Sequence, residues 1–587
     1  MNDVRIEPGM RIPEVVSRYP STREVFDRYG LKGCGGPDGP PETVEFFSRA
    51  HAVELDKLLA ELQESARKGA RSGGSTEYRY EEAPEDLLYR RFFKAGIVVA
   101  LSVGCLFGAF ILLQYAVDRS FFAVPIHLIH VHGHAQVFGW IGLIAMGFAY
   151  QAYPRFKHTT LALPRLAGAS FYLMVGGLAL RTLSQAFLQG RNMLVPVIAA
   201  GILEWAAVSF FVVVMIVTVR RSEMGVEYFD RFILTALGGF WLVSLLNPVM
   251  VYLVVSAPSP EVLIDRVATW FLPYRDLELL AFATMLIFGV SHRYLPAILG
   301  FRTPSVGLSR AIYLLFGLGI AGDIVFYLLL RRDPTPVAGI GWQASTLLML
   351  VSAVLMVWQL GILRRPEEWD RSIKFIRAAY IWLLVAFLML ALMPTYNRLT
   401  GLSFSHAYFG AYRHALTVGF ISMMILGVSS KVIPVLSGLD PKVMNPLNHA
   451  FYLLNVGNMI RVSSQIATDH VEWAFPIMGA SGFIEVTALA LWGIDIWRAI
   501  DARPAVPAVE ASHGAGAEIT ADLKVADVLD RYPETEEVFL KYGFTDIQNP
   551  VLRRTVARAA TLRMACGVHH VDEREFLAAL NERIRRG

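Results

Sequence analysis

The chain has 587 residues, of which 54% are hydrophobic and 18% are charged, and its formal net charge is +4. This composition excludes an ordinary soluble enzyme and indicates a polytopic membrane protein. The small net charge gives no reason to expect a nucleic-acid partner, and three scattered cysteines fit neither a disulfide framework nor a thiolate metal cluster.

A short pattern near the N-terminus recurs near the C-terminus. Residues 10–30, MRIPEVVSRYPSTREVFDRYG, and residues 523–543, LKVADVLDRYPETEEVFLKYG, share a Tyr-Pro and a Tyr-Gly pair at the same spacing. The apolar spacing predicts short amphipathic helices in both copies. The predicted domains are a helical module (1–66), a linker (67–92), a membrane domain (93–500), a second linker (501–517) and a second module (518–587).

Between the two modules the sequence predicts about twelve membrane helices, because each apolar stretch reaches the roughly 20 residues that cross a bilayer. The basic loops fall on one side together with both termini, which predicts cytoplasmic termini in a bacterial inner membrane with lipid around the helices. The predicted helices lie near 93–117, 125–153, 164–188, 193–219, 230–256, 268–296, 307–330, 337–363, 373–394, 403–435, 446–467 and 472–499.

Three of these helices share one pattern. His134, Asp276 and His414 are each followed by a glycine 13 residues later and a proline 20 residues later. Three such matches, four helices apart, indicate an internal repeat. The predicted fold is therefore all-α, with the membrane helices in three arcs of four around a pseudo-threefold axis.

The repeat places His134 and His414 at equivalent depths, and two facing imidazoles can hold one haem iron from both sides. The alternative is two histidines that hydrogen-bond to carbonyl groups or to each other.

Further histidines near the same end predict a second metal site. His127, His130 and His134 share one helix face, and His406 lies near the level of His127 by the repeat. His132 points elsewhere but is also a candidate ligand. Imidazoles suit copper or non-haem iron. The alternative is interfacial histidines that bind water and haem propionates.

Two segments resemble known families. HVHGHAQVFGW (130–140) and YRHALTVGFISMMILGVSSKVIP (412–434) resemble elements of the NnrS family, which is linked to nitric oxide. The second also resembles the tenth helix of haem–copper oxidase subunit I. The resemblance implies a haem, most simply b-type, with Arg413 as a propionate partner. It also implies an electron donor such as quinol or cytochrome c, and NO or O₂ as the gaseous ligand.

The same comparison shows departures from the oxidases. The expected helix-six histidine and helix-seven histidine pair are absent, which predicts no oxidase-type haem–copper centre. Asp276, Glu278 and Tyr412 are the candidate catalytic residues of a divergent reductase or oxidase. The alternatives are a proton route, or a structural pairing of the two carboxylates with Arg275.

The terminal modules resemble the small N-terminal domain of ScdA-type iron–sulfur repair proteins. Cys34-Gly35-Gly36 matches an element of that family, so Cys34 is either a redox-sensitive thiol or a small residue at a turn. The leading hypothesis is a haem-binding membrane redox protein linked to nitric oxide. The alternatives are a divergent reductase or oxidase, a non-enzymatic haem sensor, and a transporter without a cofactor.

Overall fold

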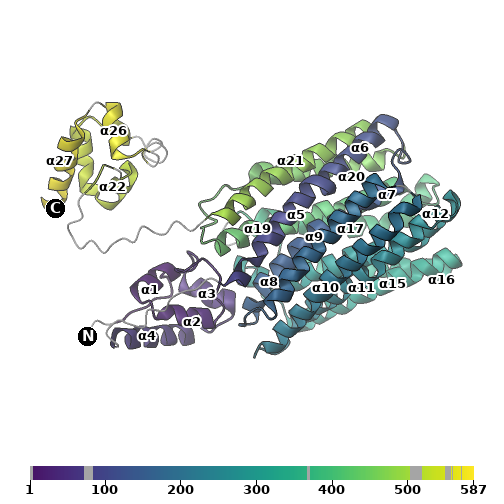
Figure 1. Cartoon of the computed structure of the whole chain (residues 1–587), viewed down its shortest axis with the longest axis horizontal. Helices are drawn as coiled ribbons and strands as arrows, with labels where there is room; N and C mark the ends of the chain where they lie inside the picture. The colour runs from purple at the N-terminus through teal and green to yellow at the C-terminus, as the bar shows by residue number, and fades with distance from the viewer. Residues whose placement is uncertain are drawn as a thin grey trace. The chain divides into compact units, whose positions relative to one another are not determined.

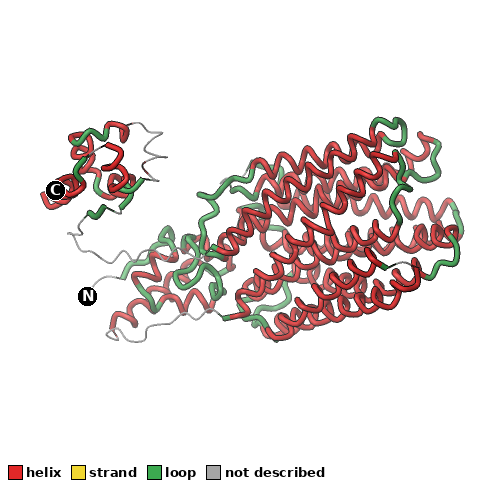
Figure 2. The backbone as a smooth tube through the Cα atoms, turned by 45° about the horizontal axis from the view of Figure 1, so that its top comes forward, coloured by secondary structure: helices red, strands yellow, loops and turns green. Residues whose placement is uncertain are grey.

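The structure is a computed structural model of the whole chain. It describes residues 4–71, 83–188, 190–365, 370–502, 519–521, 523–548, 557, 560–569 and 571–586. Every regular element in these residues is helical, and the only strand-like pairings are two isolated bridges (Figure 2). The chain divides into two compact units, Met1–Pro504 and Ala505–Gly587.

The all-α membrane fold predicted from the sequence is confirmed. Ten helices in the described residues are long and apolar enough to cross a membrane. Two further helices, Ile126–Phe156 and Asn448–Ala467, fill the remaining predicted positions but are more polar, and they fall outside those ten. The first of them carries four histidines, which explains its lower hydropathy.

The membrane helices are numbered here by position. Helix 1 is η1–α6 (Pro84–Asp118), helix 2 is α7–α8 (Ile126–Phe156), helix 3 is α9 (Pro164–Phe187), helix 4 is α10 (Leu194–Arg221), helix 5 is α11 (Tyr228–Val255), helix 6 is α12–α14 (Pro260–Leu299), helix 7 is α15 (Val306–Arg332), helix 8 is α16 (Pro336–Leu360), helix 9 is α17 (Ile373–Thr400), helix 10 is α18–α19 (His406–Leu436), helix 11 is α20 (Asn448–Ala467) and helix 12 is α21 (Ala474–Asp501).

The internal repeat appears directly in the backbone. His134, Asp276 and His414 each end an α-helical segment and are each followed by eight residues of π-helix. These segments are Ala135–Gly142, Leu277–Thr284 and Ala415–Ser422. π-Helical turns are rare and often lie at functional sites. Three of them at equivalent places support the threefold repeat of four helices.

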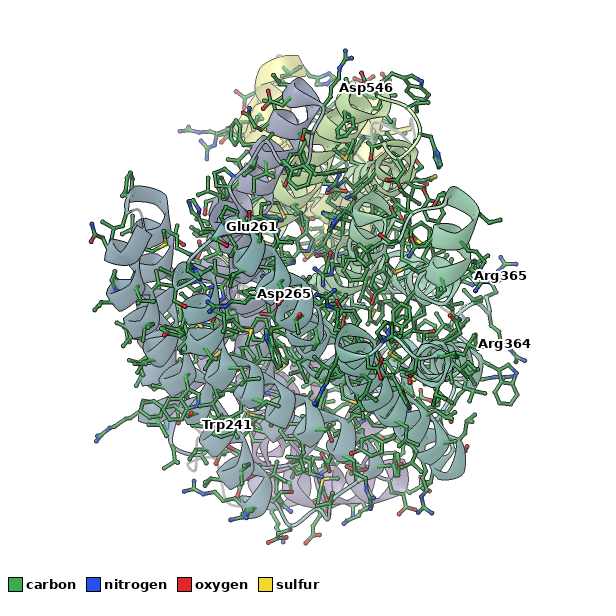
Figure 3. All side chains as sticks on the ribbon, turned by 90° about the vertical axis from the view of Figure 1, so that its right-hand side faces the viewer. Trp241, Glu261, Asp265, Arg364, Arg365 and Asp546 are labelled. Atoms are coloured by element: carbon green, nitrogen blue, oxygen red, sulfur yellow. The ribbon has the colours of Figure 1, made fainter. Side chains whose placement is uncertain are left out.

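The three helices that carry the repeat lie together along the middle of the bundle. The π-helical segment of helix 6 contacts those of helices 2 and 10. The Trp140 indole donates a 3.1 Å hydrogen bond to Ser422, which joins helices 2 and 10 directly. Helix 12 packs against helix 1 and so closes the ring. Figure 3 views the bundle towards one end, where Glu261 and Asp265 mark α12.

The N-terminal module has four helices around its own core, α1 (Ile12–Arg18), α2 (Thr22–Arg28), α3 (Val44–His51) and α4 (Leu55–Arg71) (Figure 1). α4 packs through an apolar stripe of Leu58, Leu62 and Ala66, and it continues past the predicted module end at residue 66. Residues 72–82 of the predicted linker lie outside the described residues, and helix 1 already begins at Pro84.

The C-terminal module has the same plan. Its elements are α22 (Val525–Arg531), η8 (Pro533–Thr535), α23 (Glu536–Lys541), η9 (Thr545–Gln548), α26 (Leu562–His569) and α27 (Glu573–Arg586). The bridge between Arg11 and Thr43 recurs between Lys524 and Thr561. These shared features support the duplication read from the sequence. Residues 503–517 of the second predicted linker lie outside the described residues.

Candidate cofactor site

A buried polar cluster accompanies each repeat position. The residue 43 positions after His134, Asp276 and His414 is a glycine in every case, on the next helix. The residue 47 positions after each is charged, and these three are Arg181, Asp323 and Arg461. All three are at most 6% exposed. Because an ionised side chain is costly inside a membrane, such residues mark functional or tightly paired positions.

The first and third arcs carry the same four residue types. The first-arc cluster consists of His134, Arg181, Gln185, Glu204 and Asn247. The third-arc cluster consists of His414, Arg461, Gln465, Glu485 and His132. The second-arc cluster has other residue types, Asp276, Asp323, Tyr327, Tyr412 and Arg413. The identical residue types make the first arc an internal comparison for the third.

The first-arc cluster is closed by its own hydrogen bonds. His134 Nε2 lies 2.8 Å from Glu204 Oε1, and Asn247 Nδ2 donates to Glu204 Oε2 at 2.8 Å. Arg181 then donates to Asn247 Oδ1 at 2.5 Å and to Gln185 Oε1 at 3.2 Å. Every charge in this cluster is therefore satisfied by protein atoms alone.

The third-arc cluster is open. Within the described residues, Arg461 Nε and Nη1, Gln465 Oε1 and Glu485 Oε1 are buried and have no hydrogen-bond partner. Arg461 is only 3% exposed. Leaving such groups unpaired costs about 1–3 kcal/mol each, and more for a charged group. These four atoms are therefore free to bind the polar groups of a ligand.

A single position explains the difference between the two clusters. Gly201 and Gly482 lie three residues before Glu204 and Glu485. A Cβ on Gly201 would meet Pro248 and Asn247, whereas a Cβ on Gly482 would meet Ala109. Ala109 therefore corresponds to Pro248, and the preceding Gly108 corresponds to Asn247. The asparagine that bridges the first-arc cluster is a glycine in the third.

Gly108 also gives space to a histidine. A Cβ at Gly108 would lie 2.4 Å from Cε1 of His132, so only glycine fits there. His132 comes from helix 2 and approaches helix 1, where the carbonyl of Gly104 lies 3.0 Å from its Nδ1. His132 is also one of the groups that act electrostatically on His414. The space left by Gly108 thus brings the His132 ring into the third-arc cluster.

The two histidines of the open cluster have the same hydrogen-bond arrangement. His414 Nδ1 lies 2.9 Å from the carbonyl of Gly410, as His132 Nδ1 lies near that of Gly104. Each Nδ1–H can therefore donate to a carbonyl, and among the described residues neither Nε2 has a hydrogen-bond partner. Metal-bound histidines usually donate their other ring N–H in this way. This donor set, with the orphaned polar atoms around it, fits a haem.

The geometry differs from the predicted pairing of His134 with His414. Residues 132 and 134 lie about 200° apart around an α-helix, so they face different clusters. His134 Nε2 is occupied by Glu204, whereas His132 is turned towards His414. His132 is therefore the histidine of helix 2 that lies with the third-arc cluster, and His134 lies with the first. The pairing of His134 with His414 stays a prediction, and the geometry offers His132 as a second candidate partner.

The histidines assigned to a second metal do not gather. His130 is buried with its ring stacked on Phe271, His127 is half-buried and His406 is exposed beside Phe404. Among the described residues, no three His, Cys, Asp or Glu side chains converge as metal ligands. The structure gives no support to this second metal site.

The candidate catalytic residues separate into two clusters. Asp276 lies within hydrogen-bonding reach of Asp323, and Tyr412 and Arg413 act electrostatically on this pair. Glu278 instead pairs with Arg275 at 2.5 Å and faces the first-arc cluster. The structural pairing with Arg275 considered from the sequence therefore applies to Glu278 and not to Asp276. Arg413 lies over the ring of Phe409 at 4.3 Å.

Comparison with known proteins agrees with this architecture. The family model described as NnrS protein matches residues 87–502, which is more than half of the chain and contains all three clusters. The chain belongs to the NnrS family. A second model, a domain of unknown function named DUF1858, matches residues 519–577 and so covers most of the C-terminal module. No curated protein matches the chain.

Within this NnrS-family chain, the predictions from the sequence missed Arg181, Asp323 and Arg461. All three could have been found by the same count that revealed the repeat, because each lies 47 residues after a repeat position. The likenesses to haem–copper oxidases and to ScdA-type domains remain predictions.

Proposed function

We propose that this NnrS-family protein is a haem-binding redox protein of the bacterial inner membrane, linked to nitric oxide. The family match supports the link to nitric oxide. The observation that carries the cofactor is the third-arc cluster, where two imidazoles with free Nε2 atoms lie beside a buried, unpaired arginine. Among the residues that the structure describes, the first-arc cluster has no buried polar side-chain atom without a hydrogen-bond partner.

Four of the five residues of the third-arc cluster have a definite task in this proposal. His132 and His414 would hold the iron, with their rings oriented by the carbonyls of Gly104 and Gly410. Arg461 and Gln465 would bind the carboxylates of the cofactor, because a buried guanidinium needs an anionic partner. Arg413 was the propionate partner predicted from the sequence. Its strongest electrostatic interaction with another charged group is instead with Asp276. A haem held by two histidines supplies one-electron transfer.

The test is the absorption spectrum and haem content of the purified full-length protein. His414→Ala should abolish the low-spin spectrum, and exposed His449 offers the matched control, His449→Ala, which should leave it intact. Full low-spin haem in His414→Ala would reject the proposal. The spectrum would also separate a haem protein from a transporter without a cofactor.

A second candidate function is a reductase that acts on NO or O₂, with electrons from quinol or a cytochrome. The observation that favours it is the second-arc cluster, in which two buried carboxyl groups share hydrogen-bonding contact next to Tyr412. Two carboxylates so close cannot both be ionised, so the pair holds a proton that it can give up. NO consumption by the haem-loaded protein with an added electron donor tests this activity.

A further inference from the structure

The N-terminal module docks onto the ends of the three central helices. Gln151 donates to the carbonyl of Gly33 at 3.1 Å, from helix 2. Arg293 of helix 6 donates to the carbonyl of Ala50 at 3.0 Å. The Gly35 amide donates to the carbonyl of Leu436, at the end of helix 10, at 3.2 Å. The module therefore caps the helices that carry the repeat positions, including both proposed haem ligands.

Most of these hydrogen bonds are made by backbone atoms of the module, so they depend little on its side chains. The exceptions are Arg49, which donates to the carbonyl of Ala297, and Glu42, which lies 4.0 Å from Lys431. The contact surface between the module and the helix ends, called the seam below, is largely polar. Transient interfaces between domains are also more polar than permanent ones. A polar seam can open without exposing a large apolar core.

Two histidines lie at the centre of this seam. His158, just after helix 2, has its Nε2 2.6 Å from the carbonyl of His51. The two rings are 6.4 Å apart, and the His51 ring stacks on Phe47 of the module. His158 holds this position with a φ of +46°, a strained backbone conformation for a residue other than glycine. Docking thus fixes both histidines in one defined arrangement.

The surroundings of both rings oppose a positive charge. Burial, then the neighbouring His158, Arg293 and Arg155, lowers the pKa of His51 to about 3. Burial also lowers the pKa of His158, and Arg293 and Lys157 add to this effect. The backbone of Tyr29 acts in the opposite direction on His51. The backbone of His51 and the half-exposed Glu227 do the same for His158. None of these outweighs burial.

We propose that protonation of His51 and His158 releases the N-terminal module from the ends of helices 2, 6 and 10. The undocked module binds the protons that the docked form excludes, so docking weakens as the pH falls. A histidine free in water titrates near pH 6.5. His51 alone then weakens docking about tenfold between pH 7.5 and 5.5, and His158 weakens it further in the same direction. At neutral pH the cap stays closed.

Cys34 provides a reporter of this motion. Its side chain packs against the cores of both the module and the membrane domain, and burial raises the pKa of its thiol to about 12. Cys34 is therefore less reactive while the module is docked, and it becomes more reactive when the module separates from the membrane domain. The Cys105→Ala, Cys566→Ser background leaves Cys34 as the only cysteine of the chain.

The experiment measures maleimide labelling of Cys34 in the detergent-purified full chain between pH 7.5 and 5.5. Each rate is divided by the rate of the denatured protein at the same pH, which removes the titration of the thiol itself. The normalised rate should rise at least tenfold on acidification. In the His51→Gln, His158→Asn double variant the rise should fall below twofold, because neither replacement accepts a proton.

A matched control separates opening from protonation. Arg49→Ala removes one docking hydrogen bond and leaves the charges that act on the two histidines in place, so it should raise labelling at every pH and keep the pH dependence. Circular dichroism checks that the helices of each variant remain folded. A normalised rate that stays flat from pH 7.5 to 5.5, or a double variant with an unchanged rise, would overturn the proposal. Neither result depends on whether haem is bound.

Discussion

Adding one methyl group at Gly108 should displace His132, the proposed haem ligand, without unfolding the bundle. The Cβ of alanine would lie 2.4 Å from Cε1 of His132, whereas carbon atoms in contact lie about 3.5–4.0 Å apart. Relief of this overlap requires the His132 ring to move by about 1 Å, whereas ligand distances hold to within about 0.2 Å. We therefore expect at least tenfold less low-spin haem per chain, equivalent to about 1.4 kcal/mol of lost binding.

The assay is the optical spectrum of Gly108→Ala, normalised to protein, beside Gly176→Ala as the matched control. Gly176 lies in helix 3 with no atom within 4 Å of its added Cβ, so alanine there should keep the full spectrum. Alanine also favours a helix over glycine by up to about 1 kcal/mol, so neither variant should lose helix content. A Gly108→Ala protein with the full low-spin spectrum would refute the placement of His132 in the cofactor site.

Three other substitutions and measurements follow from the clusters. Asn247→Leu should leave Glu204 and Arg181 unbridged and destabilise the protein by about 3 kcal/mol, seen as a lower melting temperature with an unchanged haem spectrum; an unchanged melting temperature would contradict the closed network. Asp276→Asn should fold and keep the low-spin haem but lose NO consumption, and a fully active variant would remove Asp276 from the functional residues. Metal analysis should find no copper magnetically coupled to a high-spin haem, and such a centre would show that the missing oxidase histidines have been replaced.

The sequence predicted the fold because the signals for it are local. Apolar stretches of about 20 residues give the membrane helices, and the Gly and Pro spacing after His134 and His414 gives the repeat. The structure adds that each repeat position is followed by a π-helical segment, which has no simple sequence signature. Helices 2 and 11 are less apolar than the other ten, although the sequence predicted all twelve.

The site was harder to predict, because it depends on which way neighbouring side chains turn. The repeat showed that His134 and His414 are equivalent, but not that each faces its own arc. His132 was predicted as a candidate ligand of a second metal and not of the haem. It points away from His130 and His134, and this direction is the reason that it reaches the third-arc cluster. The decisive residue is Gly108, because the lack of a side chain there leaves space for the His132 ring. A search for candidate ligands does not consider glycines.

The central claim is that His132, and not His134, holds the cofactor together with His414. The most direct measurement compares the low-spin haem spectra of His132→Ala and His134→Ala, each purified as the full chain and normalised to protein. The account predicts that His132→Ala loses the low-spin spectrum. It predicts that His134→Ala keeps that spectrum at a lower melting temperature, because Glu204 loses its partner. The opposite pattern, with the spectrum kept in His132→Ala and lost in His134→Ala, would contradict it.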